Sequence, residues 1–195
     1  MIITTRSVGH NTSIRQLEYI QSSKSQYIKT GVIASSDIRV VIVAQFVDSG
    51  SSAWVFGARS GTSASDKFTI LRANDLNAIR SDFGSQNENT GENPGGQFTI
   101  DKNRNVTTIG NTTVTSDAEI FSGLEMYLFA GNTNGSTTDP AALRLYSCKI
   151  YDDDVLVRDY VPAKDDSGVV CLFDFVMREY VYNSGTGSFS AGPEI

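Results

Sequence analysis

The sequence is poor in histidine and cysteine, two residues on which many active sites and metal sites depend. His10 is the only histidine in 195 residues, which excludes histidine-based catalytic triads and histidine-rich zinc sites. Cys148 and Cys171 are the only cysteines, and they do not have the spacing of a CxxC pair. We therefore predict two buried free thiols, with a single disulfide between them as the less favoured alternative.

The chain also has little positive charge and no long apolar run. Its 16 Lys and Arg residues against 22 Asp and Glu residues give a formal net charge of −6. This excess of negative charge repels a phosphate backbone, so we expect no nucleic-acid partner. The first residues lack the basic and apolar regions of a secretory signal peptide, and no run is long enough to cross a bilayer. We expect neither membrane insertion nor standard secretion.

What the sequence does contain is a series of short strand-forming runs separated by Gly, Ser, Asn and Asp. The run "FTIDKN" (98–103) alternates apolar and polar residues, whereas "VVIVAQF" (40–46) is apolar on both sides. This mixture predicts an all-β fold, a two-sheet antiparallel sandwich of jelly-roll type, over residues 17–195. Residues 1–16 are polar and unpatterned, and we interpret them as an N-terminal arm or attachment segment.

Two segments have specific expectations within this pattern. We predict that "VTTIGNTTV" (106–114) forms one strand, because it is rich in Val, Ile and Thr. We predict that "GSQNENTGENPGGQ" (84–97) is a long polar loop, either a plain hairpin connection or a binding loop.

Three adjacent carboxylates in "KIYDDDVLVRDY" (149–160) raise the question of a metal site. A two-residue hairpin loop centred on Asp153 and Asp154 explains them without a metal, because Asp tolerates positive φ. Calcium at Asp152, Asp153 and Asp154 is the second interpretation, although Ca²⁺ needs more oxygens than this tip offers. The predicted hairpin register pairs Asp152 with Val155, Tyr151 with Leu156, and Ile150 with Val157.

A second polar cluster, "GNTNGSTTDP" (131–140), supplies Asn132, Asn134 and Asp139 as candidate ligand-binding residues. The strand "ALRLYSCKIY" separates it from the acidic tip and spans roughly 30 Å at about 3.3 Å per residue. The two clusters therefore lie at opposite ends of the sandwich and cannot share one ion within a protomer.

Aromatic residues beside hydrogen-bonding side chains are the usual sign of a sugar-binding surface. The candidates are Trp54, Arg59, Tyr180 and Tyr182. In "AWVFGA" the spacing predicts that Trp54 and Phe56 share one strand face, which favours core packing for the tryptophan. For Arg59, structural hydrogen bonding is favoured over ligand contact.

Strings in the C-terminal third carry a family resemblance. They are "RLYSCKIYD" (144–152), "LVRDYVP" (156–162) and "YNSGTGSFSAGPE" (182–194), with "LEYIQSSKSQYIKTGV" and "WVFGAR" upstream. Together they resemble the concanavalin A-like (laminin G-like) jelly-roll domains found in bacteriophage structural and tail proteins and in gut-bacterial surface proteins. The resemblance covers the chain from about residue 17 to 195 and implies a two-sheet jelly roll.

The resemblance implies a module that binds and does not catalyse. We expect a virion-surface or adhesion module of a phage, such as a capsid decoration, head-fibre or tail-associated protein, with host or environmental glycans as candidate ligands. The lack of a signal peptide favours a virion protein assembled in the host cytoplasm over the alternative, a secreted or cell-surface bacterial lectin. The arm would dock on other virion proteins, and a homo-oligomer, including a trimer, stays open.

Glycoside hydrolases are the enzymes most often built on this jelly roll, and they need two facing carboxylates. The laminarinase-like string Glu-x-Asp-x-x-Glu is absent, and the nearest match is "SDAEIF" with Asp117 and Glu119. We expect these two acids to be solvated residues, and a degenerate hydrolase is the least favoured alternative.

Overall fold

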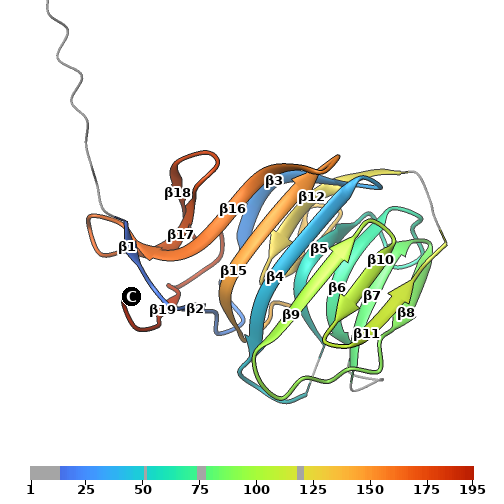
Figure 1. The fold of residues 1–195 in the computed structure, drawn as a ribbon, viewed down its shortest axis with the longest axis horizontal. Coiled ribbons are helices and arrows are strands. Elements are labelled where there is room, and N and C mark those ends of the chain that lie inside the picture. The colour runs from blue at the N-terminus through green and yellow to red at the C-terminus, as the bar shows by residue number, and fades with distance from the viewer. Residues whose placement is uncertain (1–13, 51, 74–77, 118–120) are drawn as a thin grey trace, which may run out of the picture.

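The chain folds as two β-sheets stacked face to face, as Figure 1 shows for the computed structural model. The structure describes residues 14–50, 52–73, 78–117 and 121–195. Within these ranges there is no helix, and hence none long and apolar enough to cross a membrane. The prediction of an all-β, two-sheet antiparallel sandwich of jelly-roll type is confirmed.

The larger sheet has the strand order β11-β10-β9-β4-β15-β16-β17-β18. In addition, β1 pairs with β16, and β2 pairs with both β15 and β19. The N-terminal and C-terminal strands therefore meet on this sheet. Its strands are β1 (Arg15–Gln16), β2 (Ile20–Gln21), β4 (Ile38–Phe46), β9 (Phe98–Asn103), β10 (Val106–Ile109), β11 (Thr112–Thr115), β15 (Leu143–Asp152), β16 (Val155–Lys164), β17 (Val170–Asp174), β18 (Glu179–Val181) and β19 (Ser190–Ala191).

The smaller sheet has the order β14-β13-β5-β6-β7-β8, and β12 connects β5 to β3. All of these neighbours are antiparallel except β13 and β5, which run parallel. Its strands are β3 (Ile28–Ser35), β5 (Ala53–Arg59), β6 (Lys67–Ala73), β7 (Ala78–Gly84), β8 (Gln86–Asn89), β12 (Ser122–Leu128), β13 (Gly131–Thr133) and β14 (Ser136–Thr138).

The inward faces of the two sheets form one hydrophobic core. In β4, alternate residues from Ile38 to Ala44 are buried and the residues between them are half-buried. This period of two is what a strand with one face on a core requires. The smaller sheet contributes the aromatic rings of Phe56, Phe68 and Phe83.

The charged side chain of Lys102 lies inside this core. Lys102 of β9 has no exposed surface, and its Nζ donates to Ser81 Oγ of β7 at 2.8 Å. The same Nζ lies 4.8 Å from the centre of the Phe68 ring. Burial lowers the pKa of Lys102 to about 7, and the negative charge of Asp82 partly opposes that shift. Because β9 and β7 belong to different sheets, the lysine joins the two layers.

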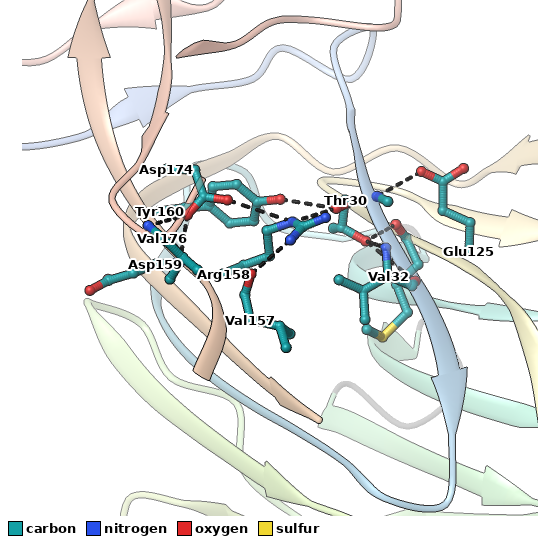
Figure 2. A network of polar contacts seen from close by, with 11 residues as sticks. Thr30, Val32, Glu125, Val157, Arg158, Asp159, Tyr160, Asp174 and Val176 are labelled. Carbon is teal, nitrogen blue, oxygen red and sulfur yellow. Dashed lines mark hydrogen bonds and ion pairs between the residues drawn. The ribbon is translucent and has the colours of Figure 1, made fainter. Parts of the chain in front are cut away.

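A second polar bridge joins the sheets where β3 faces β16, as Figure 2 shows. Arg158 Nε donates to the Thr30 carbonyl at 3.0 Å, and Tyr160 Oη donates to the same carbonyl at 3.1 Å. The Arg158 Nε also lies 3.5 Å from Oδ2 of Asp174, a fully buried carboxylate. Gly31 has a φ of +68°, and a Cβ there would come within 3.1 Å of Arg158 Nη2. Glycine thus fits this bridge where other residues would be strained.

Two predicted segments differ from the structure. Residues 106–114 form two strands, β10 and β11, because Gly110 adopts a φ of +58° and Ile109 pairs with Thr112. The turn at Gly110 is difficult to predict from the sequence because strand-forming residues stand on both sides of it. Within 84–97, Gly84 ends β7 and residues Gln86–Asn89 form the edge strand β8 against β7, so only the other residues are loop.

The β15–β16 hairpin has the predicted turn. Asp153 and Asp154 have φ values of +47° and +62°, as the two central residues of a tight hairpin loop require. The pairs Asp152 with Val155 and Tyr151 with Leu156 are confirmed. The third predicted pair is wrong, since Ile150 lies opposite Arg158 after a β-bulge and not opposite Val157.

The N-terminal arm is described only in part. Its residues 1–13 lie outside the described residues, whereas Arg15 and Gln16 form β1. The interpretation of residues 1–16 as an attachment segment separate from a 17–195 domain therefore stays a prediction. Both cysteines are buried and free, as predicted.

Candidate functional site

The outer face of the smaller sheet, which points away from the core, carries a cluster of charged and hydroxyl side chains. In one cross-strand row, Gly57 of β5 lies opposite Thr69 of β6, which lies opposite Asp82 of β7. In the next row, Leu71 of β6 lies opposite Arg80 of β7. The residues between these along each strand point into the core, because side chains alternate across a strand. Thr69, Arg80 and Asp82 therefore share the outer face.

Trp54 belongs to this outer face and not to the main core. In β5 it lies opposite Leu71, whereas Phe56 lies opposite Ile70, with a register shift between the two pairs. The prediction that Trp54 and Phe56 share a face is wrong, because the extra residue of a β-bulge reverses the alternation. Trp54 is only 1% exposed and packs with Leu71 and Ala73 in a small separate cluster.

The indole of Trp54 lies against the backbone of Gly131 in β13. A Cβ at position 131 would overlap Cε3 and Cδ2 of the indole, so a larger residue there leaves no room for the ring. The Trp54 amide donates to the carbonyl of Asp139 at 3.0 Å. The Trp54 side chain is thus buried beneath the residues of the outer face and does not form an exposed platform.

Arg59, at the end of β5, covers the indole ring of Trp54. Its guanidinium carbon lies 4.7 Å from the centre of the Trp54 ring, within the range of a cation–π interaction. Its Nε donates to Thr133 Oγ1 at 3.3 Å, and its Nη1 and Nη2 donate to no described residue. Burial lowers the pKa of Arg59, an effect that the Asp82 carboxylate partly offsets, and the group stays charged. The half-buried cation therefore has two nitrogens open to a ligand.

Arg80 and Asp82 form the second charged element of the face. Arg80 Nε and Nη2 donate to the two carboxylate oxygens of Asp82 at 2.8 and 3.3 Å, and Thr69 Oγ1 donates to Oδ2 at 3.0 Å. Asp82 has no exposed surface, whereas the Arg80 side chain is partly exposed. The carboxylate is held by three donors, which fixes Arg80 in place beside Arg59.

This arrangement is suited to binding. A stacked cation with open donors and a fixed ion pair on rigid strands can orient a polar ligand by hydrogen bonds. Its one buried carboxylate already accepts from Arg80 and Thr69, which leaves it poorly placed to take a proton from a substrate. We name the set of Trp54, Arg59, Thr133, Arg80 and Asp82 the arginine face.

Sequence reasoning found Trp54 and Arg59 but missed Arg80 and Asp82. The signal was present, since Arg80 and Asp82 stand two residues apart in a strand-forming run, which places the two charges on the same face of one strand. The sequence does not show which residues of β5 lie beside that face. β5 and β7 do not pair directly, and their relative position depends on how each of them pairs with β6.

Of the candidates from the Asn-rich segment, Asn132 and Asn134 belong to the β13–β14 turn, and Asp139 lies near the arginine face. Asn132 is buried and holds the β13–β14 turn, donating to the Glu125 carbonyl at 2.8 Å and accepting from the Gly135 amide at 2.7 Å. Asn134 is an exposed turn residue with a φ of +49°. Asp139 is exposed, and its carboxylate partly opposes the lowering of the Arg59 pKa by burial, so it lies near the arginine face.

Tyr180 and Tyr182 lie on the larger sheet, in a region separate from the arginine face. The Tyr180 ring packs edge-on against Phe173 at 5.1 Å between ring centres. Tyr182 Oη donates to Asp165 Oδ2 at 3.0 Å, and the Tyr182 side chain is half exposed. The structure therefore brings together only part of the predicted ligand-binding set.

The acidic tip faces an arginine. Asp153 and Asp154 are exposed and lie 3.6 and 3.2 Å from Arg104 Nη2. Across the described ranges, no three side chains of the Asp, Glu, His or Cys type gather as metal ligands. Calcium at Asp152, Asp153 and Asp154 stays a hypothesis, with the turn geometry alone sufficient to explain the tip.

The acids considered for hydrolysis do not form a described pair. Asp117 is exposed and accepts from Gln86 Nε2 at 2.6 Å, while its amide donates to Gln86 Oε1 at 2.8 Å. Glu119 lies outside the described residues. Comparison with protein-family models finds no match for the chain, and comparison with curated proteins finds no significant relative.

Proposed function

We propose that this protein is a non-catalytic adhesion module that binds glycans through the arginine face. The observation that carries the proposal is Arg59, a half-buried guanidinium stacked on Trp54 whose two terminal nitrogens donate to no described residue. These nitrogens are not among the buried atoms without a partner, so a ligand that supplies oxygen acceptors can reach them and form charge-assisted hydrogen bonds there.

A glycan fits the chemistry of this face. Sugar hydroxyl and carboxylate oxygens accept from arginine, and Thr133 and Arg80 border the same surface with further hydrogen-bonding groups. The Asp82 ion pair keeps Arg80 from collapsing onto the ligand position. Because the supporting residues lie on strands, little ordering cost accompanies binding.

We further propose that the module acts on a phage virion surface, with the N-terminal segment docking on another virion protein. The support is the resemblance of "RLYSCKIYD", "LVRDYVP" and "YNSGTGSFSAGPE" to jelly-roll domains of phage structural proteins. A bacterial cell-surface or secreted lectin is the alternative, and it would use the same face. Mass spectrometry of purified virions separates the two, because a lectin would be absent from every particle.

The binding proposal is tested with a glycan array followed by calorimetry on the best glycan. Arg59→Ala should weaken binding by about ten- to a hundredfold, the usual cost of one charged hydrogen-bonding group. Arg39→Ala is the matched control, because Arg39 also stacks on an aromatic ring, Tyr151 at 5.5 Å, but on the outer face of the larger sheet. A protein that binds no glycan, or equal losses in the two variants, would refute the proposal.

A further inference from the structure

The arginine face carries a cation that no described carboxylate pairs with. Arg80 forms an ion pair with Asp82, and Arg39 on the larger sheet forms one with Asp101. Arg59 forms no ion pair with any carboxylate of the described residues, and burial lowers its pKa because the guanidinium has lost part of its water. An anion beside such a cation is attracted more strongly than it would be in open solvent.

The open end of Arg59 matches the shape of a carboxylate. Its Nε donates to Thr133 Oγ1 at 3.3 Å, and one side of its plane stacks on Trp54, so the nitrogens left for a ligand are Nη1 and Nη2. These two nitrogens form a planar fork, and a carboxylate presents two oxygens that fit a fork of this kind. A sugar hydroxyl offers the same fork only one oxygen. The geometry therefore favours an acidic group over a neutral one.

A second arginine borders the same position. Arg80 donates to Asp82 through Nε and Nη2, whereas its Nη1 donates to no described residue and is not among the buried atoms without a partner. Besides burial, the positive charge of Arg80 lowers the pKa of Arg59, so the two guanidinium groups are neighbours. An anion bound at Arg59 would thus lie near two cations, and Arg80 Nη1 stays available for a further ligand oxygen.

One exposed acid lies at the margin of this position. The carbonyl of Asp139 accepts from the Trp54 amide at 3.0 Å, which places Asp139 beside the tryptophan on which Arg59 stacks. Its side chain is exposed, so water and salt screen its charge. A screened carboxylate here repels an anionic ligand weakly, and it has no such effect on a neutral ligand.

We propose that the arginine face selects acidic glycans and that Nη1 and Nη2 of Arg59 bind the carboxylate of a uronic or sialic acid end-on. This inference rests on the proposed function, because it specifies which glycans that face binds. Arg80 donates to a second oxygen of the same sugar, and Asp139 reduces the affinity without abolishing it. Because the whole chain carries a formal charge of −6, long-range attraction does not favour an acidic glycan, and binding depends on the local fork.

Glycans matched in all but charge test this selection. The array carries oligomers of galacturonate, glucuronate and mannuronate, together with sialyllactose, each beside its carboxyl methyl ester and beside neutral and sulfated glycans. Esterification should weaken binding about tenfold or more, since it removes the charge from the group that Arg59 binds.

The other outcomes separate this inference from the proposed function. Neutral glycans or esters that bind as tightly as the acids would overturn the inference and leave glycan binding by this face in place. Sulfated glycans that bind as tightly would overturn the carboxylate assignment. A protein that binds no glycan would refute the proposed function, and the inference with it.

Arg59→Lys tests the fork itself. Lysine keeps the charge but has one nitrogen, so affinity for the best acidic glycan, measured by calorimetry, should fall about tenfold. Arg144→Lys is the matched control, because Arg144 also stacks on an aromatic ring, Tyr19 at 4.5 Å, and donates through Nε to Gln21 Oε1 at 2.9 Å. Arg144 belongs to the larger sheet. Equal affinities of the two variants would contradict end-on binding by Arg59.

Asp139→Asn tests the direction of the charge effect. Removal of this carboxylate should tighten binding of the acidic glycan about two- to fivefold, the usual value of one exposed charge pair. Asp153→Asn is the control, because it removes the same charge from an exposed residue of similar φ, +47° against +40°, at the tip of the β15–β16 hairpin. Asparagine tolerates positive φ, so both variants keep their turns. Unchanged affinity in Asp139→Asn, or an equal gain in both variants, would argue against a local acidic ligand.

Discussion

Lys102 Nζ and Ser81 Oγ lie 2.8 Å apart inside the sandwich, and their hydrogen bond ties β9 of the larger sheet to β7 of the smaller one. The lysine has no exposed surface and lies beside the rings of Phe68 and Phe83. A charged amine is costly in such surroundings because it has lost its water. The pKa of about 7 is the consequence.

Stability should therefore rise with pH above neutrality. In the unfolded chain the Lys102 pKa is about 10.5, so between pH 7 and pH 10 the unfolded state binds more protons than the folded state. That difference makes the free energy of unfolding increase by up to about 1.4 kcal/mol per pH unit from this group. Urea denaturation at several pH values measures the slope.

Lys102→Met should remove this slope and raise stability at pH 7, because the Ser81 and Thr107 hydroxyls still bond one another at 2.7 Å. Lys149→Met is the control, since Lys149 is partly exposed and paired with Asp159. Equal slopes in the wild-type protein and the Lys102→Met variant would contradict the assignment.

The buried carboxylate of the arginine face should be sensitive to truncation. Asp82→Ala leaves Arg80 and Thr69 without their shared acceptor, and we expect a loss of about 2 kcal/mol in the free energy of unfolding. Asp101→Ala breaks the half-exposed Asp101–Arg39 pair and should cost less than about 1 kcal/mol. Chemical denaturation of both variants gives the comparison, and similar losses would argue against a special role for Asp82 burial.

Gly131 should be intolerant of even one methyl group. Gly131→Ala forces a Cβ into the Trp54 ring, and overpacking of this kind costs about 1–3 kcal/mol. Trp54 is the only tryptophan, so a red shift of its fluorescence reports displacement of the ring directly. Gly61→Ala is the control, because a Cβ there meets no atom within 4 Å. An unshifted spectrum in Gly131→Ala would mean that the indole does not rest on this glycine.

The acidic hairpin tip should respond as a turn. Replacing Asp153-Asp154 by Asn-Gly keeps the positive φ values and relieves charge repulsion, which should stabilise the protein by up to about 1 kcal/mol. Adding Ca²⁺ or a chelator should leave the melting temperature of the wild-type protein unchanged. A calcium-dependent rise in that temperature, lost in the Asn-Gly variant, would instead establish a metal site at the tip.

Much of the architecture could be predicted from the sequence because strands and turns depend on the preferences of neighbouring residues. Alternating runs such as "FTIDKN" predict strands with one buried face, and adjacent Asp residues between two β-forming runs predict a tight turn. Both follow from side-chain alternation and backbone φ preferences, which neighbouring residues determine. The same reasoning located Trp54 and Arg59 on one strand.

Other features depended on register between strands, which local patterns do not encode. A single extra residue in β5 places Trp54 on the sheet face opposite to that of Phe56. A β-bulge in β16 places Arg158 opposite Ile150, where Val157 was expected. Because the side-chain period of a strand is two, each one-residue shift exchanges the buried and outer faces.

The sequence by itself predicted an all-β sandwich, and it favoured a turn at the acidic tip over a calcium site and free cysteines over a disulfide. Only the tertiary structure decided that Arg59 stacks on Trp54 beside the Arg80–Asp82 pair. Those residues come from β5 and β7, which never pair directly, and their meeting is set by how β6 aligns with each of them. Local preferences specify strands and turns, whereas the packing of distant strands specifies which side chains meet.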